Sequence, residues 1–252
     1  MNFDLLVPQG SLKLIHGPHF LEPEEDISIG PRLLSHTVEK GAGSFARISR
    51  PKRTLALSSR DRSHPNFQRF LEIAQEGGFA PVLRSPGGRA VAYHEESIIL
   101  DFVSSESEPR SAMSARFDAL GTLFIEALDQ CGITATIGEI PREYCPGKHS
   151  VITKDQKLVG TAQRLVRGGW LLSASVIVRN GLPIRDLLTN IYSAMEFDMN
   201  PETIVALNEF DSTIDTDSVI AALTDTLRSH FDIEDCELLR KNELKVRELV
   251  VQ

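Results

Sequence analysis

Three strand-like segments follow one another late in the chain, and only short turns separate them. The segments are residues 150–154, 158–165 and 170–178, with turns at residues 155–156 and 167–169. Strands joined by turns this short lie antiparallel, because a parallel pair needs a much longer crossover connection. The chain is therefore expected to build around an antiparallel sheet, and no other feature of the sequence constrains its fold as strongly.

Helical periodicity flanks these strands. Apolar residues recur at helical spacing in residues 66–75, 111–130, 184–197, 201–207 and 217–231. Residues 22–40 show the same spacing, but Gly30-Pro31 predicts two helical pieces there. Further strands are expected at residues 54–58, 90–93, 97–103 and 133–137, with 90–93 paired to 97–103. The predicted fold class is α/β of the α+β type: a mixed, largely antiparallel sheet flanked by helices.

The domain organisation follows from the change of pattern after the last long strand. A length of 252 residues suits one α/β domain with a small appendage. From Pro183 onward the character is helical, and the boundary is placed near residues 197–200. The prediction is one main domain of residues 1–197 and a small helical C-terminal module of residues 198–252.

The acidic composition argues against a nucleic-acid partner. With 27 Lys and Arg against 35 Asp and Glu, the formal charge is −8, and no basic surplus exists to neutralise phosphates. An acidic partner would have to dock on a local basic patch. Six basic residues cluster in sequence and make either such a patch or a solvated loop and strand edge: Arg47, Arg50, Lys52, Arg53, Arg60 and Arg62.

Cysteine usage and the N-terminus indicate a cytoplasmic protein. Three cysteines, an odd number without framework spacing, suit a reducing compartment. Residues 1–11 lack a secretion signal, and no apolar run reaches the roughly 18 residues of a membrane helix. His16 and His19 have no acidic or cysteine partner at a metal-binding spacing. We therefore expect no membrane contact and no metal.

Gly87-Gly88 lies between two expected strands. Glycines permit positive φ and leave room for a ligand beside the bare backbone. The pair is not a P-loop, because the Gly-Lys-Ser/Thr ending is missing, and it is not a dinucleotide-binding fingerprint, because a strand rather than a helix follows. It is either a site of close ligand approach or a tight hairpin turn.

Cys145 is the candidate nucleophile. It lies in a loop, and its cationic or potentially cationic neighbours in sequence are Lys148, His149 and, on the next strand, Lys157. A cationic neighbour favours the thiolate, which is the form that attacks an acyl carbon. Cys131 ends a helix and Cys236 lies in an acidic tail, where a thiolate is disfavoured. If a cysteine is catalytic, it is therefore Cys145; the alternative is a loop cysteine without a role.

Three motifs carry a resemblance that gives these residues a context. They are residues 84–94 (RSPGGRAVAYH), residues 144–147 (YCPG) and residues 157–164 (KLVGTAQR). The first is similar to the RRxxGGxAV motif of the lipoate/octanoate transferase and ligase family, and the third to its KxxGx(A/S)QR segment. The second resembles the nucleophile loop of the family's cysteine-dependent amidotransferase branch. The resemblance spans roughly residues 50 to 195.

The resemblance implies a biotin/lipoate protein ligase-like fold and a protein N-octanoyl/lipoyltransferase that works without ATP. Cys145 would take an octanoyl or lipoyl group as a thioester and pass it to a lysine of an acceptor lipoyl domain. Lys157 would hold the carbonyl and assist proton transfer. Gly87, Gly88 and Val91 would line the tunnel for the acyl chain. The residues expected to bind substrate are Arg84, Gly87, Gly88, Ala90, Val91, His94, Gly160, Ala162 and Gln163.

The partners that the family implies are carrier proteins. They are lipoyl carrier domains, either of a glycine cleavage H-type protein or of 2-oxoacid dehydrogenase acyltransferase subunits, or an acyl carrier protein. No cofactor is expected, since the octanoyl or lipoyl group is itself the substrate. The choice between octanoyl and lipoyl, and between a thioester and an amide donor, stays open at this point.

Departures from the family pattern leave two alternatives. Ligases that activate free lipoate with ATP carry a second arginine where this chain has Ser85, a third glycine where it has Arg89, and Asp-x-Gly-Asn where it has Glu95-Glu96-Ser97-Ile98. These differences, with the Cys-Pro-Gly loop, favour acyl transfer without a nucleotide. The alternatives are an ATP-dependent lipoate or biotin ligase, and a non-catalytic relative that binds a lipoyl domain through its C-terminal helices.

Overall fold

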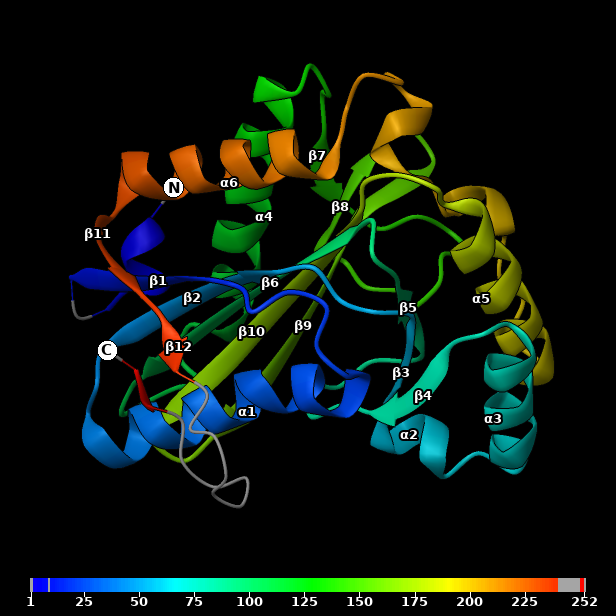
Figure 1. The fold of residues 1–252 in the computed structure, drawn as a ribbon, viewed down its shortest axis with the longest axis horizontal. Coiled ribbons are helices and arrows are strands. Elements are labelled where there is room, and N and C mark those ends of the chain that lie inside the picture. Colours follow the sequence, from blue (N-terminus) through cyan, green and yellow to red (C-terminus); the bar gives the residue numbers. More distant parts are fainter. Residues whose placement is uncertain (1, 9, 240–249, 252) are drawn as a thin grey trace.

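An eight-stranded sheet forms the centre of the computed structural model, which describes residues 2–8, 10–239 and 250–251. The strand order is β11-β1-β2-β6-β10-β9-β8-β7 (Figure 1). The two pairs at the β11 end, β11·β1 and β1·β2, are parallel, and the other five pairs are antiparallel. The strands are β1 (Ser11–His16), β2 (Ser44–Ser49), β6 (Ser97–Ser105), β7 (Thr136–Gly138), β8 (Ser150–Thr153), β9 (Gln156–Val166), β10 (Gly169–Ile177) and β11 (Asp232–Cys236). The largely antiparallel mixed sheet predicted from the sequence is confirmed.

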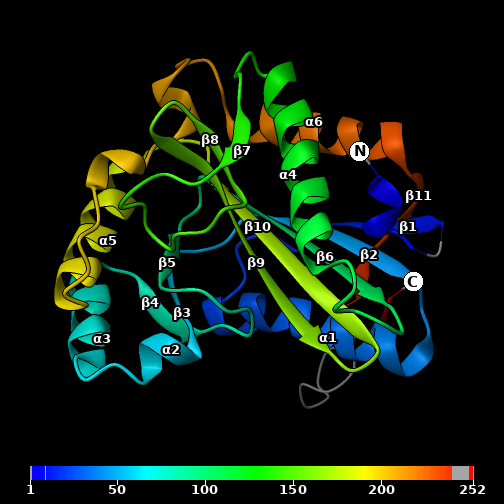
Figure 2. The same ribbon diagram turned by 180° about the vertical axis from the view of Figure 1, so that it is seen from behind.

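Helices cover both faces of this sheet. Helix α1 (Pro23–Lys40) packs on β6 and β10 from one side, and α4 (Met113–Gln130) packs on the other, with α6 (Thr216–His230) against it (Figures 1 and 2). The alternation of β10 separates the two faces. Trp170, Leu172 and Val176 enter the core beneath α4 and α6, whereas Leu171 packs with the residues of α1.

A three-stranded sheet stands beside the large one, in the order β4-β3-β5. It consists of β3 (Thr54–Leu57), β4 (Ala80–Leu83) and β5 (Val91–Tyr93), and α2 (Ser59–Arg62), α3 (Phe67–Glu76) and α5 (Leu182–Ala194) accompany it (Figure 2). The predicted pairing of 90–93 with 97–103 is wrong: β5 pairs with β3, and β6 pairs with β2 and β10. A turn in which Ser97 N–H donates to the His94 carbonyl lies between them, and the chain passes there from one sheet to the other.

The prediction of two helical pieces in residues 22–40 is also wrong. Helix α1 runs through Gly30-Pro31 without a break. Proline in a helix loses one backbone hydrogen bond. Burial of Ile29, Leu33 and Leu34 against the sheet offsets that cost. Gly30 permits the close approach: a β-carbon there would lie 3.2 Å from the Leu171 methyl groups.

The C-terminal residues pack on the same core. Instead of the helix predicted for residues 201–207, the chain forms two short 3-10 turns, η2 (Pro201–Thr203) and η3 (Leu207–Glu209). Val219, Leu223 and Leu227 of α6 share a core cluster with β1 and β6, and β11, which the sequence did not reveal, pairs parallel with β1. The separate module of residues 198–252 stays a prediction; its described part is joined to the main sheet.

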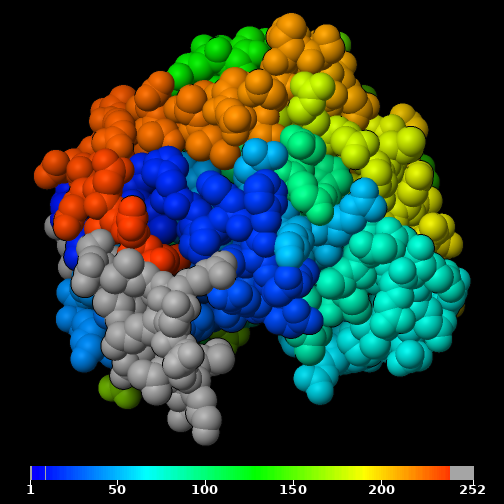
Figure 3. Space-filling model, viewed as in Figure 1, coloured from blue at the N-terminus to red at the C-terminus, as the bar shows by residue number. Residues whose placement is uncertain are grey.

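The described residues near both ends of the chain lie on the β11 side of the molecule (Figures 1 and 2). The N-terminal 3-10 turn η1 (Phe3–Leu5) contacts α4, and β12 (Leu238–Leu239) pairs with β13 (Val250–Val251). On the face seen in Figure 3 the N-terminal residues, in blue, lie between orange α6 and the cyan segment that holds α2 and α3. Within the described ranges, no helix has the length and apolar character that crossing a membrane requires.

Candidate active site

Cys145 lies in the loop between β7 and β8 with its backbone in the left-handed region, at φ 42°. A non-glycine residue rarely adopts this conformation unless its surroundings hold it there. Here the Cys145 N–H donates to the Tyr192 hydroxyl oxygen at 2.6 Å, and that hydroxyl donates to the Ala90 carbonyl at 3.0 Å. The buried Tyr192 of α5 therefore links the cysteine loop to the segment that enters β5.

Two donors from the glycine turn face the thiol. The backbone N–H of Arg89 donates to Cys145 Sγ at 3.2 Å, and Arg84 Nη2 lies 3.9 Å from Sγ. Gly88, at φ 101°, makes room for both, because a β-carbon there would lie 2.7 Å from Sγ and 2.8 Å from Arg84 Nη2. Such donors stabilise the negative charge that sulfur carries when it acts as a nucleophile or a leaving group. The glycine turn therefore does permit a close approach, and the group that lies against it is the Cys145 side chain.

The other two cysteines have different surroundings. Burial raises the pKa of the Cys131 thiol. Burial, followed by the carboxylate of Glu234, raises the pKa of Cys236. Both directions agree with the expectation that a thiolate is disfavoured at these two positions.

Lys157 is buried, and its ammonium group binds the backbone of the loop that carries Cys145. Its Nζ donates to the carbonyl oxygens of Tyr144 and Cys145, each at 3.0 Å, and lies 3.0 Å from Glu143 Oε2. Three acceptors match the three protons of an ammonium group. In this structure Lys157 therefore braces the backbone of Cys145 rather than pointing a free proton at its sulfur, and its catalytic role stays a prediction.

Glu143, which the sequence did not single out, completes this brace. Its side chain is fully buried and accepts from Gly147 N–H at 3.2 Å and from Ser150 Oγ at 2.9 Å, in addition to pairing with Lys157. A buried ion pair persists only if further hydrogen bonds satisfy its charges. The Glu143–Lys157 pair therefore holds both sides of the loop that carries Cys145.

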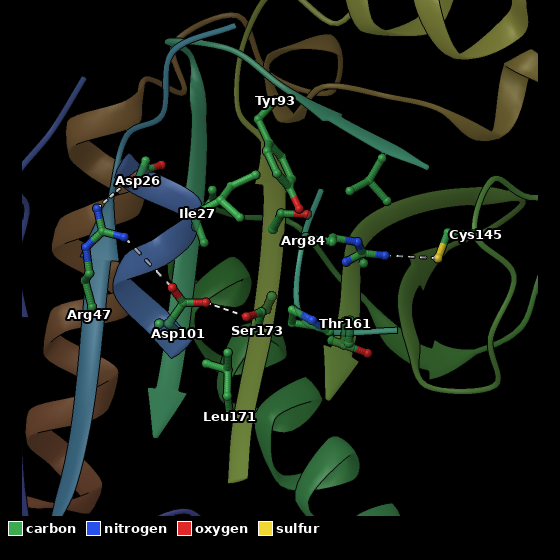
Figure 4. Close-up of a pocket in the computed structure, with 18 of the residues that line it drawn as sticks. Asp26, Ile27, Arg47, Arg84, Tyr93, Asp101, Cys145, Thr161, Leu171 and Ser173 are labelled. Carbon is green, nitrogen blue, oxygen red and sulfur yellow. Dashed lines mark hydrogen bonds and ion pairs between the residues drawn. The ribbon is translucent and has the colours of Figure 1, made fainter. Parts of the chain in front are cut away.

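An inner cavity extends from Cys145 between the sheet and α1. Including space open to solvent, it measures about 700 Å³. Figure 4 shows Cys145 at one end, Arg84, Tyr93 and Thr161 in the middle, and Asp26, Arg47 and Asp101 at the other end. The aliphatic side chains of its wall are Ile27, Pro31, Pro86, Val91, Ile99, Ala162, Leu171 and Ala174.

The far end of this cavity is a buried charge network. Arg47 pairs with Asp26 and donates to the Gly17 carbonyl from Nε at 3.1 Å, while its Nη1 lies 3.9 Å from Asp101 Oδ2. Asp101 also accepts from Ser173 Oγ. Burial raises the pKa of Asp101, and Arg47 opposes this shift. Asp26, Arg47 and Asp101 are all buried and pair with one another, so they close this end of the cavity.

The tyrosines near the thiol stay protonated. Burial raises the pKa of Tyr93 to about 12 and holds the pKa values of Tyr144 and Tyr192 well above the usual range for a phenol. Tyr192 can therefore act as a lasting hydrogen-bond donor to Ala90. It was not a candidate in the sequence, since a tyrosine in a helix resembles an ordinary core residue.

An outer cavity lies on the solvent side of Cys145. It measures about 730 Å³ including open space, and Cys145, Lys157, Thr161 and Ala162 border both cavities. Its remaining lining residues are Gly87, Gly88, Phe117, Pro146, Gly147, Lys148, His149, Ser150 and Gln163. Both polar atoms of the Gln163 amide are buried without a hydrogen-bond partner. The thiol is thus placed at the junction of the two cavities.

The predicted substrate-binding residues divide between these places. Arg84, Val91, Gly160 and Ala162 border the inner cavity. Gly87 and Gly88 border the outer cavity rather than the acyl tunnel predicted for them, because the turn folds over the thiol.

Two further candidates lie outside the lining of both cavities. The side chain of Ala90 lies in the core and only its carbonyl serves the site, through Tyr192. His94 is buried in the turn before β6, where Nε2 bonds to the Asn180 carbonyl at 2.8 Å and Nδ1 accepts from Glu96 N–H at 3.1 Å. Both ring nitrogens of His94 are therefore hydrogen-bonded to the backbone.

The basic cluster between residues 47 and 62 is not a free patch. Arg47 is buried against Asp26, and three of the others pair with carboxylates on the surface. These pairs are Arg50 with Glu96 and Asp217, Lys52 with Glu22, and Arg53 with Glu95. Of the two interpretations offered by the sequence, a solvated edge fits Arg50, Lys52 and Arg53 better than a docking patch, and Arg47 belongs to neither because it is buried.

Comparison with known proteins identifies the family. The family described as lipoyl protein ligase A/B catalytic domain matches residues 23–228. An octanoyl-[GcvH]:protein N-octanoyltransferase of Geobacillus kaustophilus is 24% identical over 241 residues, which cover 89% of this chain and 84% of the relative. A lipoyl-[GcvH]:protein N-lipoyltransferase of Listeria monocytogenes is 24% identical over 191 residues, 71% of this chain and 68% of the relative.

Solved structures support the fold. A lipoate-protein ligase A bound with ATP superposes with a TM-score of 0.71 at 17% identity, covering 91% of this chain and 89% of that one. A bipartite lipoate protein ligase from Thermoplasma acidophilum gives a TM-score of 0.63 at 17% identity, covering 91% and 87%. The predicted ligase-like fold is confirmed. The chain, over most of its length, belongs to the lipoyl protein ligase A/B catalytic domain family.

Proposed function

We propose that this protein is an octanoyl/lipoyl amidotransferase, an acyltransferase that moves the acyl group from a donor carrier domain to a lysine of an acceptor lipoyl domain. The observation that carries the proposal is the position of Cys145. Its thiol lies where a cavity with apolar walls meets an open cavity, with the Arg89 N–H and Arg84 directed at the sulfur. A thioester formed at this point has its acyl chain inside and its carbonyl within reach of a partner.

The inner cavity suits a medium acyl chain. Its wall between Cys145 and the Arg47 network is largely aliphatic. Each methylene of the chain that leaves water contributes roughly 0.8 kcal/mol, so the chain binds without a charged contact. Because the Asp26–Arg47–Asp101 group closes the far end, the cavity also limits the length of chain that it accepts.

In the first half of the reaction the Cys145 thiolate attacks the acyl carbonyl of the donor. The S–C bond forms, and the bond to the donor's nitrogen or sulfur breaks. In the second half the lysine amine of the acceptor attacks the thioester, the C–N bond forms, and sulfur leaves as the thiolate. The Arg89 N–H and Arg84 stabilise this thiolate in both directions.

The proposed donor is an acylated H-type protein of the glycine cleavage system. Support comes from the two transferases just described, whose names include GcvH. The proposed acceptors are the lipoyl domains of 2-oxoacid dehydrogenase subunits, and acyl carrier protein is a second possible donor. Both kinds of carrier would enter at the outer cavity.

The reaction is proposed to proceed without ATP. An acyl group that arrives as an amide is passed to another amide, and one that arrives as a thioester moves to a more stable bond. Neither transfer needs activation by a nucleotide. The departures from the ligase motifs at Ser85, Arg89 and residues 95–98 support this.

Intact-mass analysis tests the proposal. The protein is incubated with an octanoylated H-type protein, without nucleotide, and is then mixed with an unmodified lipoyl domain. We expect an octanoyl adduct on the wild-type enzyme, its absence from Cys145→Ala, and its movement to the lipoyl domain. Transfer that occurs only with free octanoate or lipoate and ATP would support the ligase alternative. Binding of the carrier without any adduct or transfer would support the non-catalytic one.

A further inference from the structure

The outer cavity contains a histidine–carboxylate pair that the mechanism above does not use. His149 follows Cys145 by four residues in the same loop, and both line this cavity. Its Nδ1 lies 2.7 Å from Asp118 Oδ1 of α4, and its ring stacks on Phe117 with centroids 5.0 Å apart. Helix α4 therefore fixes the orientation of the imidazole.

The hydrogen bonds also fix which nitrogen can accept a proton. An ionised carboxylate only accepts, so Nδ1 carries the hydrogen and Nε2 has the free lone pair. The remaining neighbour of Nε2 is the Ser114 hydroxyl at 3.3 Å, a long contact that an incoming amine can displace. The side chain is 15% exposed, so it is accessible from the cavity while remaining ordered by its partners.

The amide-forming half of the reaction needs such an acceptor. A lysine arrives as an ammonium ion and must lose a proton before it can attack. Lys157 is poorly suited to take it, because all three of its protons are engaged by Tyr144, Cys145 and Glu143. The remaining charged side chain that lines the outer cavity is Lys148, itself a cation.

We infer that His149, positioned by Asp118, is the general base toward the acceptor lysine; this rests on the proposed function. Nε2 takes one proton from the ammonium and passes it to water. The amine lone pair then forms the C–N bond to the thioester carbon. As the C–S bond breaks, its electron pair leaves on Cys145 Sγ, and Nε2 takes the second proton from nitrogen.

The same residue acts as the acid when the donor is an amide. By microscopic reversibility, the leaving lysine nitrogen of an octanoylated H-type protein must gain a proton, whereas a thioester donor releases a thiolate that needs none. His149 is therefore expected to matter for acylation from an amide and not for acylation from a thioester. A purely structural role would affect both donors equally.

The test compares His149→Gln with a matched control, His230→Gln. His230 also pairs with a carboxylate, Glu126, but lies on α6 and does not line the outer cavity. Each variant is acylated with the octanoyl thioester of a small thiol and then mixed with an unmodified lipoyl domain in single-turnover experiments. We expect His149→Gln to acylate at the wild-type rate and to transfer about 10² to 10⁴ times more slowly at pH 7. Asp118→Asn is expected to show a smaller loss.

Two further measurements test the inference: the pH dependence of the transfer rate and the rate with a different nucleophile. The defect of His149→Gln should shrink as pH rises and the lysine loses its proton unaided. It should also be much smaller with hydroxylamine, a nucleophile that is already neutral at pH 7 and needs only the second proton removed. The inference would be overturned if His149→Gln slowed transfer to lysine and to hydroxylamine equally, or slowed transfer equally at all pH values. Slower acylation of this variant from the thioester donor would overturn it too. If the wild-type enzyme forms no octanoyl adduct with either donor, the proposed function itself fails.

Discussion

The inner and outer cavities share Cys145 and three residues of β9, Lys157, Thr161 and Ala162, but the rest of each is built from different parts of the chain. Strands of the sheet and helix α1 form the inner wall, and the Arg47 network closes it. The outer cavity is bordered by the glycine turn and by the loop of residues 145–150. Under the proposed function, selection of the acyl chain depends on the packed sheet, while transfer depends on loops braced by Lys157 and Tyr192. Substitutions in one cavity should therefore have effects that differ from those of substitutions in the other.

The largest effect is expected at the junction of the cavities. Cys145→Ala should abolish acyl transfer, because no other cysteine lines either cavity, and should leave the fold intact. Intact mass measures the adduct and thermal unfolding measures stability. Cys131→Ala, at a position away from both cavities, is the control. Retained turnover in Cys145→Ala would refute the thioester mechanism.

The next effect concerns the brace of the outer loop. Lys157→Met should slow acyl-enzyme formation by about 10² to 10³, as is usual when one preorganised electrostatic contact is lost. It also leaves the buried Glu143 unpaired, at a cost of about 3–5 kcal/mol in stability. Lys157→Arg should not rescue the rate fully, since a planar guanidinium cannot reproduce the three contacts that the compact ammonium makes with Tyr144, Cys145 and Glu143.

A second substitution separates rate from stability at Lys157. Adding Glu143→Gln to Lys157→Met removes the unpaired buried charge, so the double variant should regain part of the unfolding free energy. If Lys157 acts on the reacting carbonyl, single-turnover acylation stays slow. Recovery of the rate together with stability would show instead that the lysine only holds the loop.

The glycine turn offers an internal comparison. Gly88→Ala should impair acylation strongly, because the new β-carbon would lie 2.7 Å from Sγ and the residue has φ 101°. Gly87→Ala should cost much less, since nothing lies within 4 Å of a β-carbon at that position. The measurement is the single-turnover rate of adduct formation for both variants. Similar losses in both would contradict the close approach of the turn to the thiol.

The smallest effect belongs to the inner wall and appears in stability. Burial raises the pKa of Asp101 above its ordinary 3.8, so above that pH the folded state binds more protons than the unfolded chain. Stability therefore falls as pH rises from the unfolded pKa through the folded one. Asp101→Asn should remove this part of the pH dependence, as followed by chemical denaturation at several pH values. An unchanged slope would show that Asp101 does not titrate in this window.

Local patterns predicted the antiparallel strands and the long helices. β8, β9 and β10 are joined by tight turns, and α4 and α6 have long periodic faces, so their sequences nearly suffice. The unbroken α1 was not predictable, since only burial against Leu171 and its neighbours outweighs the proline. β11 was missed because an acidic strand shows no apolar alternation.

The site residues also fall into those that local sequence predicts and those that only the fold brings together. Cys145, Lys157 and the glycine pair stand in contiguous motifs, so the sequence marked them. Tyr192 and Glu143 act through contacts that only the fold creates, a helix hydroxyl on a distant loop and a carboxylate buried beside Lys157. His94 looked like a site residue because it follows the glycine motif, yet the backbone of the fold uses both its nitrogens.

The parallel pairing of β11 with β1 has a consequence for folding kinetics. It joins residues from near the two ends of the described chain, Ser11 with Asp232 and Ile15 with Cys236. Contacts this distant in sequence carry a high loop-closure entropy and form late. During synthesis β1 and β2 emerge from the ribosome long before β11, so the outer edge of β1 waits unpaired. A chaperone that covers exposed strand edges would act on this protein at that edge.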